Sequence, residues 1–459
     1  MEELCAGFAR VNITPLMGIP LAGYYETRIS DGVLDELEAN ALALSLGETK
    51  LLAISVDHLG IEQRWLDPIR RYVADSAGIP LEGVFIACTH THTAPLIRQE
   101  AADGAQRGYL RFLQGRLADA ARFALADLRP ARMGWAVGRA PGIAFERRFR
   151  MKDGSIITNP GVENPDIVGP VGQPDERVSV LRFDREDAPG IVLVHFGVHP
   201  DTVGGCKVSA DWPGFARRFV ERAIEGVRCI LFNGAQGDVN HVNVAPKEGE
   251  LNGLTMDFDD VMRGYGHARH MGRTVAGAVM QVFDKACYTP VHSLRALQRT
   301  VQAASNMPRP EELPLARRYD KLHREHRDGE IPYEGMLLTT VVAEAERILR
   351  LEHGPEAFPL HLSVLAIGEV ALFGIPGEPF AAVGQAIGAG AKDWQLVLSC
   401  CCANGYEGYF PMMDAFEEGG YEARSSIFQA GVAETIVREG LGMLAAVRYG
   451  SEGGKAYVE

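Results

Sequence analysis

The chain has 459 residues, of which 46% are hydrophobic and 23% charged, the balance of a soluble globular protein rather than a disordered one. Its 46 Lys and Arg against 60 Asp and Glu give a formal net charge of −14. This sign argues against nucleic acid or an anionic membrane surface as a partner, because both attract basic patches. The most apolar stretch, 362–375, is too short to cross a bilayer. We therefore expect no stable membrane association.

The cysteines and the N-terminus bear on the compartment. Eight cysteines are sparse for this length, and three are consecutive, at Cys400, Cys401 and Cys402. Consecutive residues cannot build a regular disulfide framework, which favours a reducing compartment. The first residues contain no basic segment followed by an apolar run, as a secretory signal does. We expect a cytoplasmic protein with one or two of these three thiols buried in the core.

Short apolar runs alternate with amphipathic stretches from start to finish. The apolar runs predict strands at 51–56, 84–88, 178–183, 191–198 and 228–232. The amphipathic stretches predict helices at 65–77, 109–128, 215–224 and 269–283. A turn at 187–190 makes the third and fourth strands a β-hairpin, and a turn at Gly368 and Glu369 makes a second hairpin within 362–375.

The organisation of these elements predicts the fold class. The segment at about 307–351 is strongly charged, and we expect it to be a helical excursion on the surface. No repeat is visible, and no linker rich in Pro, Gly or Ser divides the chain. We therefore predict a single α/β domain spanning 1–459, with a mixed β-sheet flanked by helices, and we expect its functional site at the strand ends.

The clearest motif is Thr-His-Thr-His-Thr-Ala-Pro at 89–95, directly after the predicted strand at 84–88. His90 and His92 would project on the same side of an extended chain. Imidazole is the commonest zinc ligand, so one or both histidines could bind a metal. The alternative is that both hydrogen-bond within their loop.

Other polar groups also follow predicted strands. His199 comes just after the strand at 191–198, whereas His195 lies inside it and is expected to be a core histidine. Asp238 and Asn240 lie in a Gly-rich loop after the strand at 228–232. Glu378 stands between two prolines after the second hairpin, and as an alternative it could cap the helix that follows.

Taken together, these segments resemble the catalytic region of the neutral/alkaline non-lysosomal ceramidase family, which are zinc-dependent amidases. The likeness covers nearly the whole chain, from Gly-Phe-Ala-Arg-Val-Asn-Ile-Thr-Pro at 7–15 to Tyr421. Its most specific pieces are the histidine motif at 89–95, which resembles the family's THTHSGP, and Pro-Gly-Glu at 376–378. The separation of twelve between Tyr409 and Tyr421 also matches the family's paired tyrosines.

The resemblance implies a role for each matching residue. The residues that it implies as ligands of Zn²⁺ are His90, His199, Glu378 and Tyr409. It implies that His92 handles protons beside the metal and that Tyr421 hydrogen-bonds the developing oxyanion. Arg147 matches an arginine with a similar task, although Arg148 is adjacent.

The chain also departs from this family's pattern. Asn240 stands where the family has a serine nucleophile, and a carboxamide cannot take that role. The chain ends at Glu459, so we expect no C-terminal immunoglobulin-like domain, and the secretory signal is absent. All three departures point away from ceramide itself.

These observations predict a zinc-dependent, ceramidase-like hydrolase that cleaves the amide (carbon–nitrogen) bond of a small N-acylated substrate by zinc-activated water. An N-acylated amine or amino sugar fits this prediction, with Asp238 or Asn240 orienting water or substrate. One alternative is an ester or lactone hydrolase on the same site, and another is a catalytically silent relative that binds a ligand. An amidohydrolase barrel is disfavoured because no eightfold βα run follows the histidine motif. A small-molecule substrate is the expected partner, and a homo-oligomer is left open.

Overall fold

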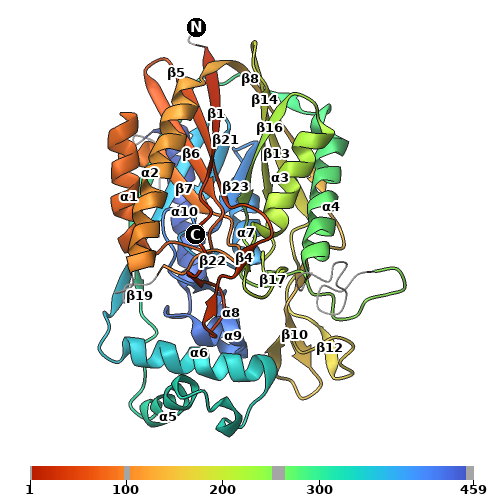
Figure 1. Ribbon diagram of the computed structural model, residues 1–459, viewed down its shortest axis with the longest axis vertical. Coiled ribbons are helices and arrows are strands. Elements are labelled where there is room, and N and C mark those ends of the chain that lie inside the picture. Colours follow the sequence, from red (N-terminus) through yellow and green to blue (C-terminus); the bar gives the residue numbers. More distant parts are fainter. Residues whose placement is uncertain (1–2, 98–103, 251–263, 451–459) are drawn as a thin grey trace.

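The computed structural model describes residues 3–97, 104–250 and 264–450. Its largest element is a nine-stranded sheet in which β14 pairs with β16, and β6 with β7, in parallel, while the remaining pairs are antiparallel (Figure 1). In spatial order, its main strands are β16 (Val227–Asn233), β14 (Gly190–Phe196), β13 (Arg177–Arg185), β8 (Arg129–Arg139), β1 (Leu4–Asn12), β5 (Glu38–Leu46), β6 (Thr49–Val56) and β7 (Val84–Cys88). The ninth strand, β18 (Cys287–Tyr288), pairs with β8. The predicted mixed α/β fold is therefore confirmed.

A second, four-stranded sheet packs against one face of the first. Its strands, in spatial order, are β19 (Leu294–Ala304), β20 (Ala357–Ile367), β21 (Val370–Gly374) and β23 (Leu396–Cys400). Leu372 and Leu398 from this sheet share one hydrophobic cluster with Phe85 and Phe232 from the large sheet. The rings of Phe85 and Phe232 lie 6.0 Å apart, so strands from opposite edges of the large sheet meet in this cluster.

Helices cover the outer faces of both sheets, because each carries one apolar side. On the large sheet these helices are α1 (Gln63–Ala77), α2 (Gly104–Ala126), α3 (Asp211–Ala223) and α4 (Tyr265–Phe283). On the small sheet they are α7 (Ala381–Gly390) and α10 (Val432–Tyr449). The predicted excursion at 307–351 contains α5 (Leu313–Arg324) and α6 (Gly335–Leu351), which lie together at the bottom of Figure 1.

The large sheet is curled, and this brings distant strand ends together. Ser55 on β6 donates a 2.5 Å hydrogen bond to the carbonyl of Leu231 on the edge strand β16, although five strands lie between β6 and β16 in the order of the sheet. At the carboxyl ends, the side-chain Nδ2 of Asn233 donates to the backbone carbonyls of Thr89 (3.0 Å) and Val198 (3.2 Å). The loops that follow β7, β14 and β16 therefore meet at one place.

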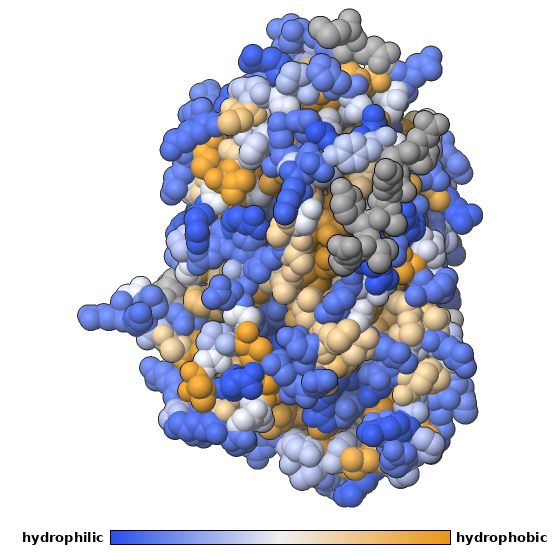
Figure 2. Space-filling model, turned by 180° about the vertical axis from the view of Figure 1, so that it is seen from behind, coloured by the Kyte–Doolittle hydropathy of each residue, from blue (hydrophilic) through white to orange (hydrophobic). Residues whose placement is uncertain are grey.

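The face in Figure 2 is mostly hydrophilic, with apolar residues in small separate groups. Among the helices of the described residues, none combines the length and the apolar character needed to cross a membrane. Cys400, Cys401 and Cys402 are all buried, so the expectation of one or two buried thiols was too low.

Candidate metal centre

Three histidines converge where the strand ends meet. His90 and His92 lie in the loop after β7, and His199 lies just after β14. The ring of His90 lies 5.0 Å from that of His92 and 4.9 Å from that of His199, measured between centroids. One nitrogen from each ring lies within 4.8 Å of the others, so the cluster could hold a metal ion. All three side chains are buried.

The two loop histidines meet for a reason that the sequence pattern did not give. The backbone of His90 has φ +75°, in the left-handed region, so the chain is not extended there. The expectation that His90 and His92 project together from an extended chain was therefore wrong. The turn is held by the His90 amide, which donates to the His58 carbonyl, and by the His92 amide, which donates to the Pro200 carbonyl (2.8 and 3.2 Å).

Glu378 joins the cluster from the small sheet's side. It begins the two-residue strand β22 (Glu378–Pro379), and its Oε2 lies 3.1 Å from Nε2 of His90 and 3.1 Å from Nε2 of His199. In the part of the chain that is described, none of these three buried atoms has a well-oriented hydrogen-bond partner. Donor atoms around a tetrahedral zinc ion lie about 3.3 Å apart, given its usual bond lengths. The separations and the donor types therefore fit a metal ion of this coordination geometry.

In His90, His199 and Glu378, the polar side-chain atom that faces away from the cluster makes a hydrogen bond of its own. His90 Nδ1 donates to the Leu59 carbonyl (2.7 Å), and His199 Nδ1 donates to the Gln236 carbonyl (2.9 Å). The Tyr406 hydroxyl donates to Glu378 Oε1 (2.7 Å). Such partners orient metal ligands and set the histidine tautomers. Both Nε2 atoms are thereby left as lone-pair donors facing Glu378.

The predicted tyrosines and arginine gather beside this cluster. Tyr409 lies on β24 (Tyr409–Phe410), which pairs in parallel with β22 so that Tyr409 is the register partner of Glu378. The rings of Tyr409 and Tyr421 lie 5.5 Å apart, edge to face. The guanidinium of Arg147 lies over both rings, at 5.4 and 6.0 Å from their centroids. Arg148 instead lies over Phe380, so Arg147 is the arginine that faces the site.

The charges of the site follow from burial and from these neighbours. Burial by itself would raise the pKa of Glu378, but in their protonated forms His90 and His199 outweigh it through their charge and their hydrogen bonds, and hold that pKa well below its usual range. Burial, reinforced by His90 and His199, lowers the pKa of His92 well below its usual value. Burial raises the pKa of Tyr421 to about 12. At neutral pH, His92 can therefore accept a proton, and Tyr421 keeps one to donate.

Asp238 and Asn240 contact other groups than the histidines. The Asp238 carboxylate accepts a hydrogen bond from the Ala381 amide at the start of α7 (2.7 Å). The Asn240 side chain donates to Asn159 (2.8 Å) and accepts from the Val242 amide (2.9 Å). Their loop holds Arg147, whose backbone amide donates to the Asp238 carbonyl and whose Nη2 donates to the Gly237 carbonyl (2.9 and 2.5 Å). These contacts make the loop a support for Arg147.

The sequence motifs singled out Tyr409 and missed Tyr406, three residues earlier in the chain. They also missed Asp201, whose Oδ1 lies 3.6 Å from Nδ1 of His92 and also accepts from the Tyr24 hydroxyl. Gly23 packs against His92 so closely that a Cβ there would lie 2.6 Å from Nδ1, and its φ is +102°. Gly23 and Tyr24 lie in Leu-Ala-Gly-Tyr at 21–24, to which no role was assigned from the sequence, and no sequence motif marked Asp201.

A cavity of about 200 Å³ adjoins the cluster. Tyr25, Tyr406, Tyr409 and Tyr421 line it, and its polar wall includes Glu62, Arg350 and Glu407. His195, by contrast, donates from Nε2 to the Ser399 carbonyl (3.0 Å) and lines a separate cavity. His195, within β14, therefore points to the separate cavity, whereas His199, three residues after the end of β14, points to the histidine cluster.

The fold and the cluster together define a class: a mixed α/β protein with a buried His, His, Glu cluster at its strand ends that could hold a metal ion. The structure is similar to the crystal structure of the neutral ceramidase from Pseudomonas aeruginosa, with a TM-score of 0.72 and 18% sequence identity, over 98% of this chain and 75% of that one. A solved structure of a ceramidase complexed with C2 matches with the same TM-score, identity and coverage of this chain, and with 76% of its own chain. No protein-family model matches the sequence, and no curated protein matches it. The chain thus has the neutral ceramidase fold, as its motifs predicted.

Proposed function

We propose that this protein is a zinc-dependent hydrolase that cleaves the amide bond of a small N-acylated substrate. The observation that carries the proposal is the convergence of Nε2 of His90, Nε2 of His199 and Oε2 of Glu378 in a buried cluster, with both contacts to the carboxylate at 3.1 Å. The ceramidase fold supports an amide as the bond that is cleaved.

The proposed ligands of the ion are His90, His199, Glu378 and Tyr409. Two imidazoles and two oxygen donors suit Zn²⁺, whereas Mg²⁺ and Ca²⁺ prefer oxygen alone. Bound zinc supplies a Lewis acid that polarises a carbonyl and lowers the pKa of water to about 7.

The chain's other residues supply proton transfer and charge stabilisation. His92 is buried next to His90 and His199, and as a neutral imidazole it takes a proton from the attacking water and returns it to the leaving amine. Tyr421 and Arg147 donate hydrogen bonds toward the oxyanion that forms at the carbonyl. Arg147 keeps this position because Glu422 Oε1 accepts from its Nε (2.6 Å).

The substrate's size follows from the cavity beside the cluster. A volume of about 200 Å³ with a wall of tyrosines, Glu62, Arg350 and Glu407 suits a short, polar N-acyl compound. Its limited volume and its charged residues favour a short acyl group over a long one. Asn240 provides no nucleophile, and its amide is already engaged by Asn159 and Val242. Water is therefore the proposed attacking group.

Metal analysis and hydrolysis assays of the purified protein test the proposal. We expect one zinc ion per chain and turnover of short N-acyl amines in preference to a fluorogenic ceramide. His90→Ala should lose zinc and turnover together, while His353→Ala, which changes an exposed histidine, should keep both. Full activity of His90→Ala without metal would contradict the mechanism.

Two further assay results would redirect the proposal. Faster cleavage of matched esters or lactones than of amides would support the alternative hydrolase on the same site, because the same electrophilic ion serves either bond. Zinc retention without turnover of any amide or ester would support a catalytically silent relative that binds its ligand in this cavity.

A further inference from the structure

The cavity beside the histidine cluster carries charged side chains of both signs, and the proposed mechanism uses none of them. Glu62 immediately precedes α1, Glu407 lies in the loop before β24, and Arg350 lies near the end of α6. Arg350 belongs to the excursion at 307–351, whose charge pattern predicted a surface segment. The excursion therefore supplies a charged group to the cavity.

Two tyrosines connect this cavity to the proposed zinc ligands. The ring of Tyr406 lies 5.8 Å from that of His90, and the ring of Tyr409 lies 6.5 Å from that of His199, measured between centroids. Both tyrosines line the cavity. A substrate whose amide lies at the cluster would therefore extend its other end along these rings toward the charged wall.

Glu407 is the acidic group that remains for a ligand. Its Oε1 accepts from the Gln63 amide in the first turn of α1 (3.3 Å), and no hydrogen bond from the described residues reaches its Oε2. Glu62, by contrast, is paired with Arg64 (2.6 Å). Burial raises the pKa of Glu407 to about 7, and Arg350 is near enough to oppose this rise. An ammonium group bound beside Glu407 would favour its carboxylate form.

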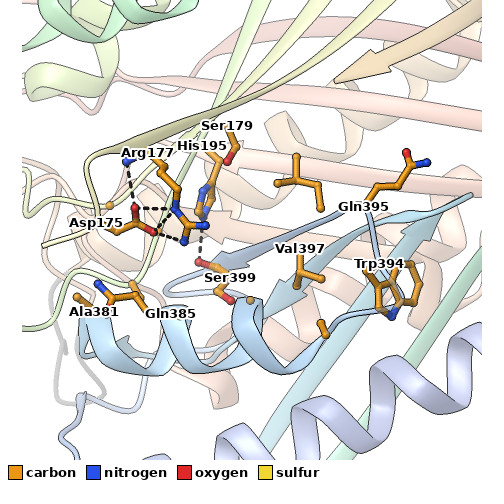
Figure 3. Close-up of a pocket in the computed structure, with 17 residues that line it drawn as sticks. Asp175, Arg177, Ser179, His195, Ala381, Gln385, Trp394, Gln395, Val397 and Ser399 are labelled. Atoms are coloured by element: carbon orange, nitrogen blue, oxygen red, sulfur yellow. Dashed lines mark hydrogen bonds and ion pairs between the residues drawn. The ribbon is translucent and has the colours of Figure 1, made fainter. Parts of the chain in front are cut away.

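Arg350 is the basic group of the same wall. Its guanidinium lies over the ring of Phe358 (5.8 Å to the centroid) and forms no ion pair with another described residue. In the separate cavity that His195 lines, by contrast, Arg177 donates to both oxygens of Asp175 and is neutralised (Figure 3). A guanidinium without such a partner can bind the carboxylate of a ligand, often through two parallel hydrogen bonds.

We propose that the substrate is an N-acylated amine whose other end is an α-amino acid group, as in a diamino acid that is acylated on its side chain. Given the proposed hydrolase function, on which this inference rests, the amide lies at the histidine cluster. The α-ammonium donates to Glu407, and the α-carboxylate accepts from Arg350. Both charges of an α-amino acid group are attached to one carbon, which suits a wall where an acidic and a basic side chain lie near each other.

A ligand with a single charge fits this wall less well. A cation would pair with Glu407 but would lie near Arg350, and an anion would pair with Arg350 but would lie near Glu407. A neutral ligand would leave both groups without a partner. A zwitterion is therefore the class of ligand that engages the two side chains together.

Four amides of matched shape separate the two charges. Nδ-acetylornithine carries both, N-acetylputrescine lacks the carboxylate, δ-acetamidovalerate lacks the ammonium, and N-butylacetamide lacks both. We expect kcat/KM of Nδ-acetylornithine to exceed that of either singly charged amide by about threefold or more. It should exceed that of N-butylacetamide by about tenfold or more.

Two variants assign the two charges. Glu407→Gln should lower the ratio of kcat/KM between Nδ-acetylornithine and δ-acetamidovalerate, which differ only in the ammonium group. Arg350→Met should lower the ratio between Nδ-acetylornithine and N-acetylputrescine, which differ only in the carboxylate. A ratio within one variant is insensitive to a general loss of activity. Glu346→Gln changes an exposed glutamate of α6 outside the cavity, and as a control it should alter neither ratio.

The outcomes separate this inference from the hydrolase proposal. If N-butylacetamide or a singly charged amide is cleaved as efficiently as Nδ-acetylornithine, the inference is overturned while the hydrolase proposal stands. Unchanged ratios in both variants would overturn it as well. If none of the four amides is cleaved, the result counts against the hydrolase proposal, and binding to the zinc-loaded protein by ligand-observed NMR decides the inference. Nδ-acetylornithine should then bind most tightly, and equal binding of all four would overturn the inference.

Discussion

Tyr406→Phe should reduce zinc affinity without unfolding the protein. The phenol donates a 2.7 Å hydrogen bond to Oε1 of Glu378, whose Oε2 faces both histidines. Phenylalanine keeps the ring and removes this donor alone. Because the Glu378 side chain is 1% exposed, water cannot readily replace the lost hydrogen bond. The carboxylate would then be free to turn away from the position that His90 and His199 share.

Two lines of reasoning give the size of this effect. A hydrogen bond to a buried charged group contributes about 1.5–3 kcal/mol. Loss of a group that orients a metal ligand weakens metal binding by about 10- to 100-fold, which corresponds to about 1.4–2.7 kcal/mol. The two ranges overlap, so we expect the zinc dissociation constant of Tyr406→Phe to rise by at least about tenfold.

Competition with a chromophoric chelator measures this constant directly. Tyr288→Phe is a matched control, because the Tyr288 hydroxyl also donates to a carboxylate, that of Asp184. Tyr288 is exposed to solvent and takes no part in the cluster. The control should bind zinc as the wild type does. A dissociation constant of Tyr406→Phe within about twofold of wild type would refute the view that this phenol orients Glu378.

Three further predictions address stability and the neighbouring loop. Burial lowers the pKa of His58 from its usual 6.5 to about 4. Between these two pH values, His58 is therefore protonated in the unfolded chain and neutral in the folded one. The free energy of unfolding should therefore fall by about 3 kcal/mol as the pH drops from 6.5 to 4, and His58→Phe should flatten this slope in urea titrations at several pH values. Arg217→Met leaves the buried Asp57 without the guanidinium that contacts both its oxygens (2.9 and 2.5 Å), and should cost about 3–5 kcal/mol of stability. A loss below about 1 kcal/mol in chemical denaturation would contradict that estimate. Asn240→Ala should lower stability by about 1–2 kcal/mol while zinc content and turnover stay near wild type. A loss of turnover of about a thousandfold would show instead that Asn240 acts on the substrate.

The sequence by itself determined the class of fold and most of the residues around the cluster. Alternating strands and helices predicted an α/β protein, and the predicted strands at 51–56 and 84–88 correspond to β6 and β7. The strands β5 and β8 were not predicted, because β5 is rich in Ala and β8 contains two Gly, and both residue types are uncommon in strands. The short motifs at 89–95 and 376–378 identified His90, His92 and Glu378, because residues within a short motif keep a fixed spacing along the chain.

The tertiary structure alone decided which of these groups meet and what each one contacts. His90, His199 and Glu378 are far apart in the sequence, and they come together because the large sheet curls until β7 and β16 meet at their carboxyl ends. The structure also separated Tyr406 from Tyr409, and His195 from His199, although each pair lies within a few residues. Spacing fixes position along the chain, whereas the direction of a side chain depends on backbone angles such as the positive φ of His90 and on hydrogen bonds to distant segments.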